Sequence, residues 1–283
     1  MYMKSIPPSQ IKALINLIGR ETGHQAGILR DELAQVIKHQ PDTLHRVIQQ
    51  EFHSSVPAAL VSAMHEICWE ELIDEVIRFS SKINPDLEEG LAIVTRFINP
   101  AVQAQEITQS LDNFMLVLRP LLSPCKTSQD ILETFSHFFF DAQGLTVLPA
   151  AYDIKDISFG RFLQKKHGSA LCLATLYEVC ARRLNLNVGL VDMAGRALVY
   201  CTTPDSAAPL FADPLDNGKI LTLDDCREYI FTRNLEWNDD FITPLSSRAV
   251  IRRFLGNMIF ILHRLRDERR LGYLRNYMDI LKN

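Results

Sequence analysis

The sequence has no run of apolar residues that approaches the roughly 18 needed to cross a bilayer as a helix. Its first ten residues include a lysine but no apolar core of the kind found in signal peptides. The formal net charge of −4 is not the basic balance that is common in nucleic-acid-binding domains. These absences predict a cytoplasmic protein that has no membrane partner and does not act mainly on nucleic acid.

The six cysteines form no Cys-x-x-Cys pair, and no histidines accompany them at zinc-binding spacing. We therefore expect reduced thiols, and we predict neither a metal site nor a cofactor. Apolar residues, in contrast, are plentiful and make up 47% of the 283 positions. A chain of this length and composition can bury a substantial core in one large domain or two.

Residues 9–80 have apolar positions at helical spacing and are predicted to form four helices in two pairs. Breaks are expected at residues 19–23, 39–42 and 53–57. Each pair takes up a little under about 40 residues, which is typical of a HEAT-type hairpin, although an irregular helical cap fits the pattern equally well. In either case residues 1–82 would need a neighbouring surface to cover their exposed face, so we expect them to dock on the C-terminal remainder of the chain.

A break at Pro85 is the predicted domain boundary, because proline disfavours a helical residue before it and Asp86 can cap a helix that starts at Leu87. Three helices are expected in the helical region at residues 83–158, and they cover residues 87–98, 103–122 and 128–140. The aromatic residues of the third helix recur at three- and four-residue spacing, which favours core packing over a ligand pocket.

Residues 159–245 change to a mixed pattern. A helix over about residues 170–184 is apolar almost all round and should be central. Short strands are then expected at residues 188–191, 197–200, 210–212 and 220–222. The predicted fold class is therefore α+β, mainly α, with one central helix packed on a small antiparallel sheet. Residues 246–283 predict a helical hairpin broken near Arg266.

Three motifs carry a resemblance to a known family. They are the run Asp86 to Gly90, the segment Phe162 to Gly168, and Asp213-Pro214 followed by Gly218. Over residues 85–281 the chain resembles the SirB-type, transglutaminase-like proteins of bacteria. The resemblance implies a papain-like core, with a HEAT-like extension before it in some relatives and a tetratricopeptide-like hairpin after it, to which residues 250–281 are similar.

The resemblance also implies where an active site would lie. An active member carries a cysteine at the start of the central helix, a histidine on the next strand and an aspartate on the one after. The matching positions are Ala170, Arg196 and Asp213. Because a guanidinium stays protonated, Arg196 cannot act as a base. The resemblance thus implies a vestigial site in a non-catalytic module that binds a protein or peptide partner.

Two features leave alternatives open. Cys172 lies within the first turn of the central helix, where the helix dipole lowers a thiol pKa, and His167 is just upstream. A cysteine-dependent enzyme of amide transfer or hydrolysis could use Cys172, His167 and Asp213, whereas a buried structural cysteine is the plainer interpretation. Arg196 could either face Asp213 as a charge-assisted pair or point into solvent.

The C-terminal helices are rich in arginine, which could form a basic face. The arginines are Arg248, Arg252, Arg253, Arg264, Arg266, Arg269, Arg270 and Arg275. Such a face could meet an acidic protein or nucleic acid. Because no exposed aromatics interleave with these arginines, nucleic acid is the less favoured partner, and a solvated helical face or protein docking is expected.

Overall fold

The computed structural model of the chain describes residues 6–18, 20–21, 23–51 and 56–282. Inter-residue contacts divide it into two compact units, Met1–Asp74 and Glu75–Asn283. The division falls inside α4 (Ala58–Ser81), and α4 itself ends just before the break predicted at Pro85. The expected docking of the N-terminal helices on the rest of the chain stays a prediction.

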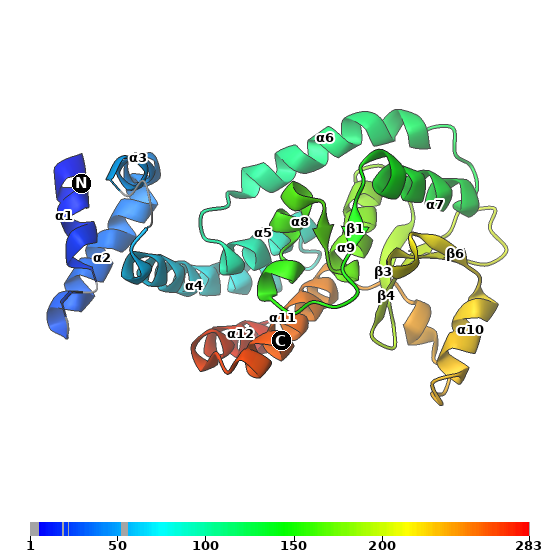
Figure 1. Cartoon of the computed structure of the whole chain (residues 1–283). Coiled ribbons are helices and arrows are strands. Elements are labelled where there is room, and N and C mark those ends of the chain that lie inside the picture. Colours follow the sequence, from blue (N-terminus) through cyan, green and yellow to red (C-terminus); the bar gives the residue numbers. More distant parts are fainter. Residues whose placement is uncertain (1–5, 19, 22, 52–55, 283) are drawn as a thin grey trace. The chain divides into compact units, whose positions relative to one another are not determined.

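The first unit contains the four helices predicted from the apolar spacing (Figure 1). They are α1 (Pro8–Leu17), α2 (His24–His39), α3 (Pro41–Glu51) and the first part of α4. Ile11, Leu33 and Leu60 are fully buried in their shared core. Residues 19 and 22 of the first expected break and residues 53–55 of the third lie outside the described residues. That these helices are HEAT-type repeats stays a prediction.

Helix α5 (Leu87–Ile98) is largely buried in the helical part of the second unit. The Asp86 carboxylate accepts a hydrogen bond from the Glu88 N–H at 3.1 Å, which is the predicted N-cap. The helix packs against α8 (Phe159–Lys165) and α11 (Ser247–Leu265). A Cβ at Gly90 would lie 2.5 Å from Cγ1 of Ile251, so the close approach of α5 to α11 requires a glycine.

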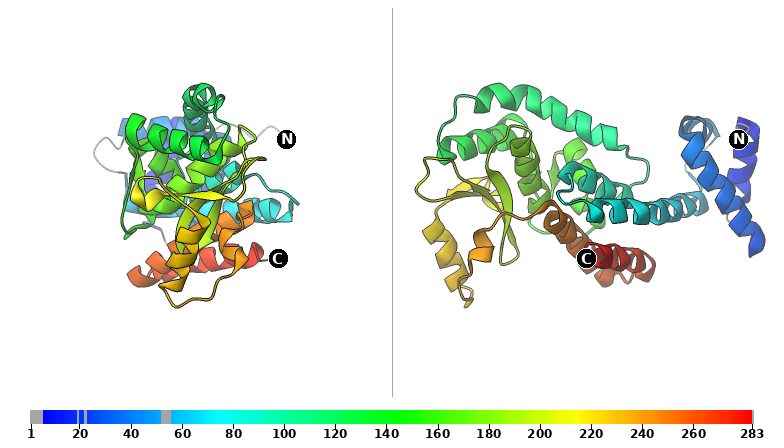
Figure 2. Two further views of the ribbon diagram at one scale, coloured as in Figure 1. Left: turned by 90° about the vertical axis from the view of Figure 1, so that its right-hand side faces the viewer. Right: turned by 180° about the vertical axis from the view of Figure 1, so that it is seen from behind.

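Two further helices flank the core of this unit, α6 (Ala104–Leu122) and α7 (Ser128–Ser136). Figure 2 shows the long α6 running along one side of the unit, with α11 on the opposite side. A π-helical turn, His137–Ala142, continues α7 and was not predicted. The aromatic run is core, as expected from its spacing, since Phe138 and Phe139 are buried and the Phe139 ring lies 4.8 Å from that of Tyr177.

The mixed part of the second unit holds a central helix and a four-stranded sheet. The helix is α9 (Ala170–Arg182), and the strands are β3 (Val188–Met193), β4 (Arg196–Cys201), β5 (Leu210–Asp213) and β6 (Lys219–Leu221). The strands follow one another in sequence order, and every pair is antiparallel. Nearly all of α9 is buried, as its apolar pattern predicted. The α+β, mainly α fold class is confirmed.

The sheet has a helix on each face (Figure 1). Helix α9 packs against β3 and β4. On the other face Val191, Leu198 and Phe211 form a cluster with Ile230 of α10 (Leu223–Phe231). Because side chains alternate along a strand, the residues between these, such as Ala197 and Val199, point towards α9. This alternation decides which strand residues can meet the start of α9.

Two short strands that the sequence patterns did not predict form a pair just before the start of α9. Strands β1 (Thr146–Val147) and β2 (His167–Gly168) form a parallel pair. The C-terminal hairpin, in contrast, was predicted and consists of α11 and α12 (Glu268–Ile280), separated at Arg266 and Asp267. All six cysteines have free thiols. None of the helices in the described ranges combines the length and apolar character needed to cross a membrane.

Candidate functional site

The start of α9 is fixed by two contacts of Ser169, its N-cap. The Ser169 hydroxyl accepts a hydrogen bond from the Cys172 N–H at 3.4 Å, and the Ser169 N–H donates to the Asp156 carbonyl at 3.0 Å. The second bond ties the helix to the 3₁₀ turn Ile154–Ile157. Ala170 is therefore the first helical residue, at the position where the resemblance implied a nucleophile.

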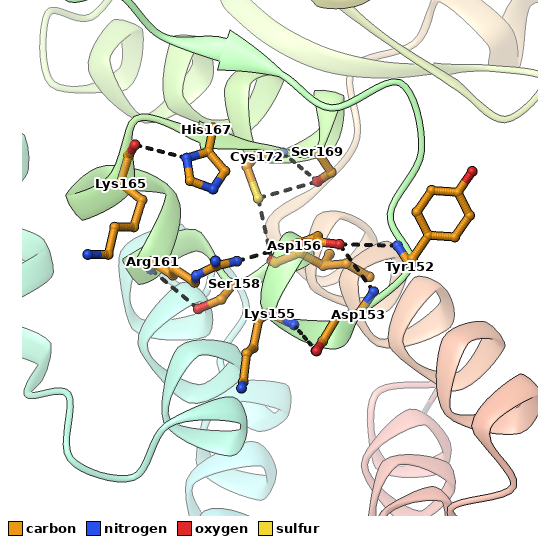
Figure 3. Close-up of polar contacts among 11 residues, drawn as sticks. Tyr152, Asp153, Lys155, Asp156, Ser158, Arg161, Lys165, His167, Ser169 and Cys172 are labelled. Carbon is orange, nitrogen blue, oxygen red and sulfur yellow. Dashed lines mark hydrogen bonds and ion pairs between the residues drawn. The ribbon is translucent and has the colours of Figure 1, made fainter.

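Cys172 points into the protein interior. Its side chain has no exposed surface, and its Sγ lies 3.4 Å from both the Ile157 carbonyl and the Ser169 hydroxyl (Figure 3). Burial raises the pKa of the thiol to about 12, against a smaller opposing effect of the bonds from Ser169. At neutral pH almost no thiolate is present, so this cysteine lacks the character of an activated nucleophile.

His167 does not assist Cys172. Its Nδ1 lies 3.0 Å from the Lys165 carbonyl, and it sits in β2 opposite Thr146. No hydrogen bond joins the His167 ring to the Cys172 sulfur in the described part of the chain. The geometry expected of a relocated thiol and base is therefore absent, because one side chain is turned to the backbone and the other is sealed in the core.

Ala170 opens onto a cavity of about 330 Å³. Three elements far apart in the sequence contribute to its wall: α9 supplies Ala170 and Leu171, β4 supplies Arg196 and Ala197, and α11 supplies Arg253 and Arg264. The segment 148–152 closes one side. A cavity of this size at the head of a central helix could hold one or two side chains of a ligand.

Arg196 and Asp213 form a charge-assisted pair, which was one of the two arrangements considered for them. Nη2 of Arg196 donates to Oδ2 of Asp213, whose side chain is only 1% exposed. The other carboxylate oxygen accepts from the Leu215 N–H at 2.9 Å. Both oxygens of this buried carboxylate are thus satisfied within the protein, and Asp213 fixes the turn after β5.

The pair does not complete a triad with Ala170. Strand alternation puts Arg196 and Asp213 on the face of Leu198 and Phe211, which α10 covers. The Arg196 guanidinium accordingly lies 5.2 Å from the Tyr229 ring of α10. Arg196 borders the cavity at the edge of the sheet, but the strand residue that faces α9 is Ala197. Arg196, which the resemblance matched to the histidine position, therefore lies on the face of the sheet that α10 covers.

A second arginine site at the cavity was missed by the sequence patterns. Nη2 of Arg253 donates to the Gly195 carbonyl at 2.8 Å, and Nη1 lies 3.1 Å from Oδ1 of Asp192. The Asp192 carboxylate also accepts from the Gly195 N–H at 2.8 Å. Burial lowers the pKa of Arg253, and Asp192 opposes that shift. These contacts hold the β3–β4 turn against α11 at the mouth of the cavity.

Three of the eight C-terminal arginines are held by contacts within the chain. Arg248 donates to the Ser80 carbonyl at 2.7 Å, and Arg270 pairs with Asp267 at 2.9 Å. Arg253 is engaged by Gly195 and Asp192. Arg248, Arg253 and Arg270 thus have structural roles, and the expectation of a solvated helical face or protein docking stays a prediction for the other five arginines. Nucleic acid as a partner remains the less favoured expectation.

Among the described residues, no group of three or more histidine, cysteine, aspartate or glutamate side chains is arranged to hold a metal ion. The polar residues that line the cavity around Ala170 are arginines together with Ser169, Asn257 and Tyr152, and the rest of the wall is mainly apolar. Such a lining can bind an anion or a polar chain, and Ala170 itself carries no nucleophile.

A family model described as the transglutaminase-like superfamily matches residues 105–256, which is more than half of the chain. The matched region runs from α6 into α11 and includes α9, the whole sheet and most of the cavity wall. No curated protein and no solved structure matched the chain.

Proposed function

Because the chain belongs to the transglutaminase-like superfamily, we propose that it is a non-catalytic member that binds a protein partner through the cavity at the start of α9. One observation carries the proposal. Ala170, with a methyl side chain, stands at the head of the central helix and lines the cavity, while the nearby Cys172 thiol is sealed in the core. We also assign the chain to the SirB-type bacterial group, on the three motifs of its sequence, and to the cytoplasm.

The cavity supports binding of a peptide segment of that partner. Its walls are mainly apolar, with polar groups at a few positions, which is the usual character of a ligand pocket. Exposed apolar side chains at its edge, such as Phe260 and Tyr152, offer further area. A partner that inserts one or two side chains would cover surface that the chain itself leaves open.

Alkylation of the native chain tests the non-catalytic part of the proposal. With iodoacetamide at pH 7.5 and mass spectrometry, we expect modification of the half-buried Cys125 and none of Cys172 until the chain is denatured. We also expect no thiol-dependent amide hydrolysis or transfer. Selective modification of Cys172 in the native chain would instead support the enzyme that uses Cys172 and Asp213.

A cavity-filling variant tests the binding part. Ala150 is exposed and lines the cavity, so Ala150→Trp should fill it without disturbing the core. In affinity purification of the full chain from its native cells, we expect a protein that is retained by the wild type and lost with Ala150→Trp. Ala208→Trp, at an exposed position that does not line this cavity, should retain it. Equal retention by both variants would overturn binding through the cavity.

A further inference from the structure

The charged side chains that line the cavity are all arginines. Arg196, Arg253 and Arg264 contribute to its wall, and no aspartate or glutamate does. Two of the three are paired with carboxylates, but these carboxylates do not border the cavity. Arg264 is exposed and has no ion-pair partner among the described residues; its guanidinium lies 5.8 Å from the Phe260 ring. Arg264 is therefore the cavity-lining cation whose charge no carboxylate of the described residues balances, in a chain whose net charge is −4.

Two arginines also have unused donors. Nε of Arg196 and Nη1 of Arg253 are buried and have no hydrogen-bond acceptor in the described part of the chain. The Asp192 carboxylate forms an ion pair with Nη1 but is misaligned for a hydrogen bond. A buried donor without an acceptor is destabilising, and a ligand oxygen that reached either donor would relieve part of that cost.

The head of α9 adds backbone donors at the same place. The N–H groups of Ala170 and Leu171 lie in the first turn and donate to no acceptor among the described residues. Both residues line the cavity with the arginines. A helix N-terminus attracts anions through its free N–H groups and its dipole, and here it coincides with three cationic side chains.

The remaining wall is apolar and partly open to solvent. Tyr152, Leu215 and Phe260 border the cavity with 72%, 45% and 63% of their surface exposed. An inorganic anion would leave these side chains uncovered. A ligand that joins an anionic group to apolar side chains would use both parts of the wall.

We propose that the cavity binds a peptide that presents a carboxylate beside apolar side chains. The carboxylate is held between the N-terminus of α9 and the Arg264 guanidinium, and the apolar side chains cover Leu215 and Phe260. The inference rests on the proposed peptide-binding function and adds the chemistry of the peptide. The same carboxylate could come from a chain terminus or from an acidic side chain.

Amide chemical shifts of the full chain, followed by NMR, test the inference with three probes. The probes are acetyl-Leu-Phe with a free carboxylate, the same dipeptide as its C-terminal amide, and acetyl-Leu-Glu-Phe amide, in which only the side chain is anionic. We expect saturable shifts at Ala170 and Leu171 with a carboxylate probe and none with the neutral one. The two anionic probes distinguish a terminal from a side-chain carboxylate.

Variants on one helix provide the matched control. Arg264→Gln should weaken binding of the anionic probe at least fivefold, whereas Arg252→Gln, at an exposed position on α11 that does not line the cavity, should leave it unchanged. Equal shifts with the neutral dipeptide, or no shift with either anionic probe, would overturn the inference. Neither result affects the outcome of the alkylation test on Cys172, so the non-catalytic assignment is tested independently.

Discussion

At Cys172 two effects compete over the charge of one thiol. The dipole at a helix N-terminus stabilises an anion by about 0.3–1 kcal/mol, which is less than one unit of pKa. Burial acts in the opposite direction and raises the pKa of this thiol from 9.0 to about 12. Burial therefore outweighs the dipole. Position near a helix start does not activate a cysteine when the side chain turns into the core.

Removal of Arg196 would leave Asp213 as a buried carboxylate without its counter-charge. We expect Arg196→Met to lower the free energy of unfolding by about 2–3 kcal/mol, which is less than the roughly 3–5 kcal/mol for a fully buried pair, because 29% of the Arg196 side chain is exposed. Urea unfolding would measure the loss. The double variant Arg196→Met, Asp213→Asn should recover part of the lost stability, because it removes the unpaired charge. A double variant less stable than Arg196→Met alone would show that the charge of Asp213 is not the source of the loss.

At the scale of elements, two glycines in hairpin turns make a matched pair. Gly195 and Gly218 both have positive φ, at 91° and 75°. A Cβ at Gly218 would lie 2.3 Å from the Ser136 hydroxyl, whereas one at Gly195 would meet nothing within 4 Å. We expect Gly195→Ala to cost about 1 kcal/mol of backbone strain and Gly218→Ala clearly more. Thermal unfolding would show this order, and equal losses would mean that Ser136 moves aside freely.

Glu178 links α9 to the edge strand β3. Its side chain is 2% exposed, it pairs with Arg182, and it accepts from the Leu190 N–H at 3.0 Å. Burial raises the pKa of Glu178, and Arg182 opposes that shift. The folded state therefore favours the protonated acid, and the stability that this preference contributes is lost as pH rises from 4.5 through the folded pKa.

The variant Glu178→Gln should remove this pH dependence. We expect the stability of the wild type relative to Glu178→Gln to fall with rising pH above 4.5 and then to level off. Urea unfolding of both proteins across pH 4 to 8 would test it. Glu133→Gln, which changes an exposed glutamate on α7, serves as the control. Parallel curves for wild type and Glu178→Gln would show that Glu178 keeps its ordinary protonation in the fold.

The helices were predictable from the spacing of their apolar residues. Which face of each short strand packs against a helix was not predictable. The apolar spacing around Leu87 and the proline before it define α5, and the same reasoning located α9. A strand of six residues such as β4 offers no internal clue to which side meets a helix. The sequence reasoning thus selected Arg196 without indicating which face of β4 it occupies, and it did not pair Asp192 with Arg253.

On the scale of the whole molecule, one helix belongs to two compact units. Leu60 and Ile67 of α4 lie in the core of the first unit, while Glu75, further along the same helix, pairs with Arg96 of α5 at 2.6 Å in the second. Each unit has its own buried apolar residues. Separate cores allow separate unfolding transitions, which the two tryptophans can report independently.

Trp69 lies in the first unit and Trp237 in the second, so variants that keep one tryptophan isolate one transition. We expect Leu33→Ala, which empties a fully buried position in the first core, to cost about 2–5 kcal/mol and to move the Trp69 transition to lower urea. Leu17→Ala, at a side chain 41% exposed, should change it by about 0.5 kcal/mol or less. The Trp237 transition should stay in place. If both transitions moved together with Leu33→Ala, the continuous α4 would couple the two units into one cooperative fold.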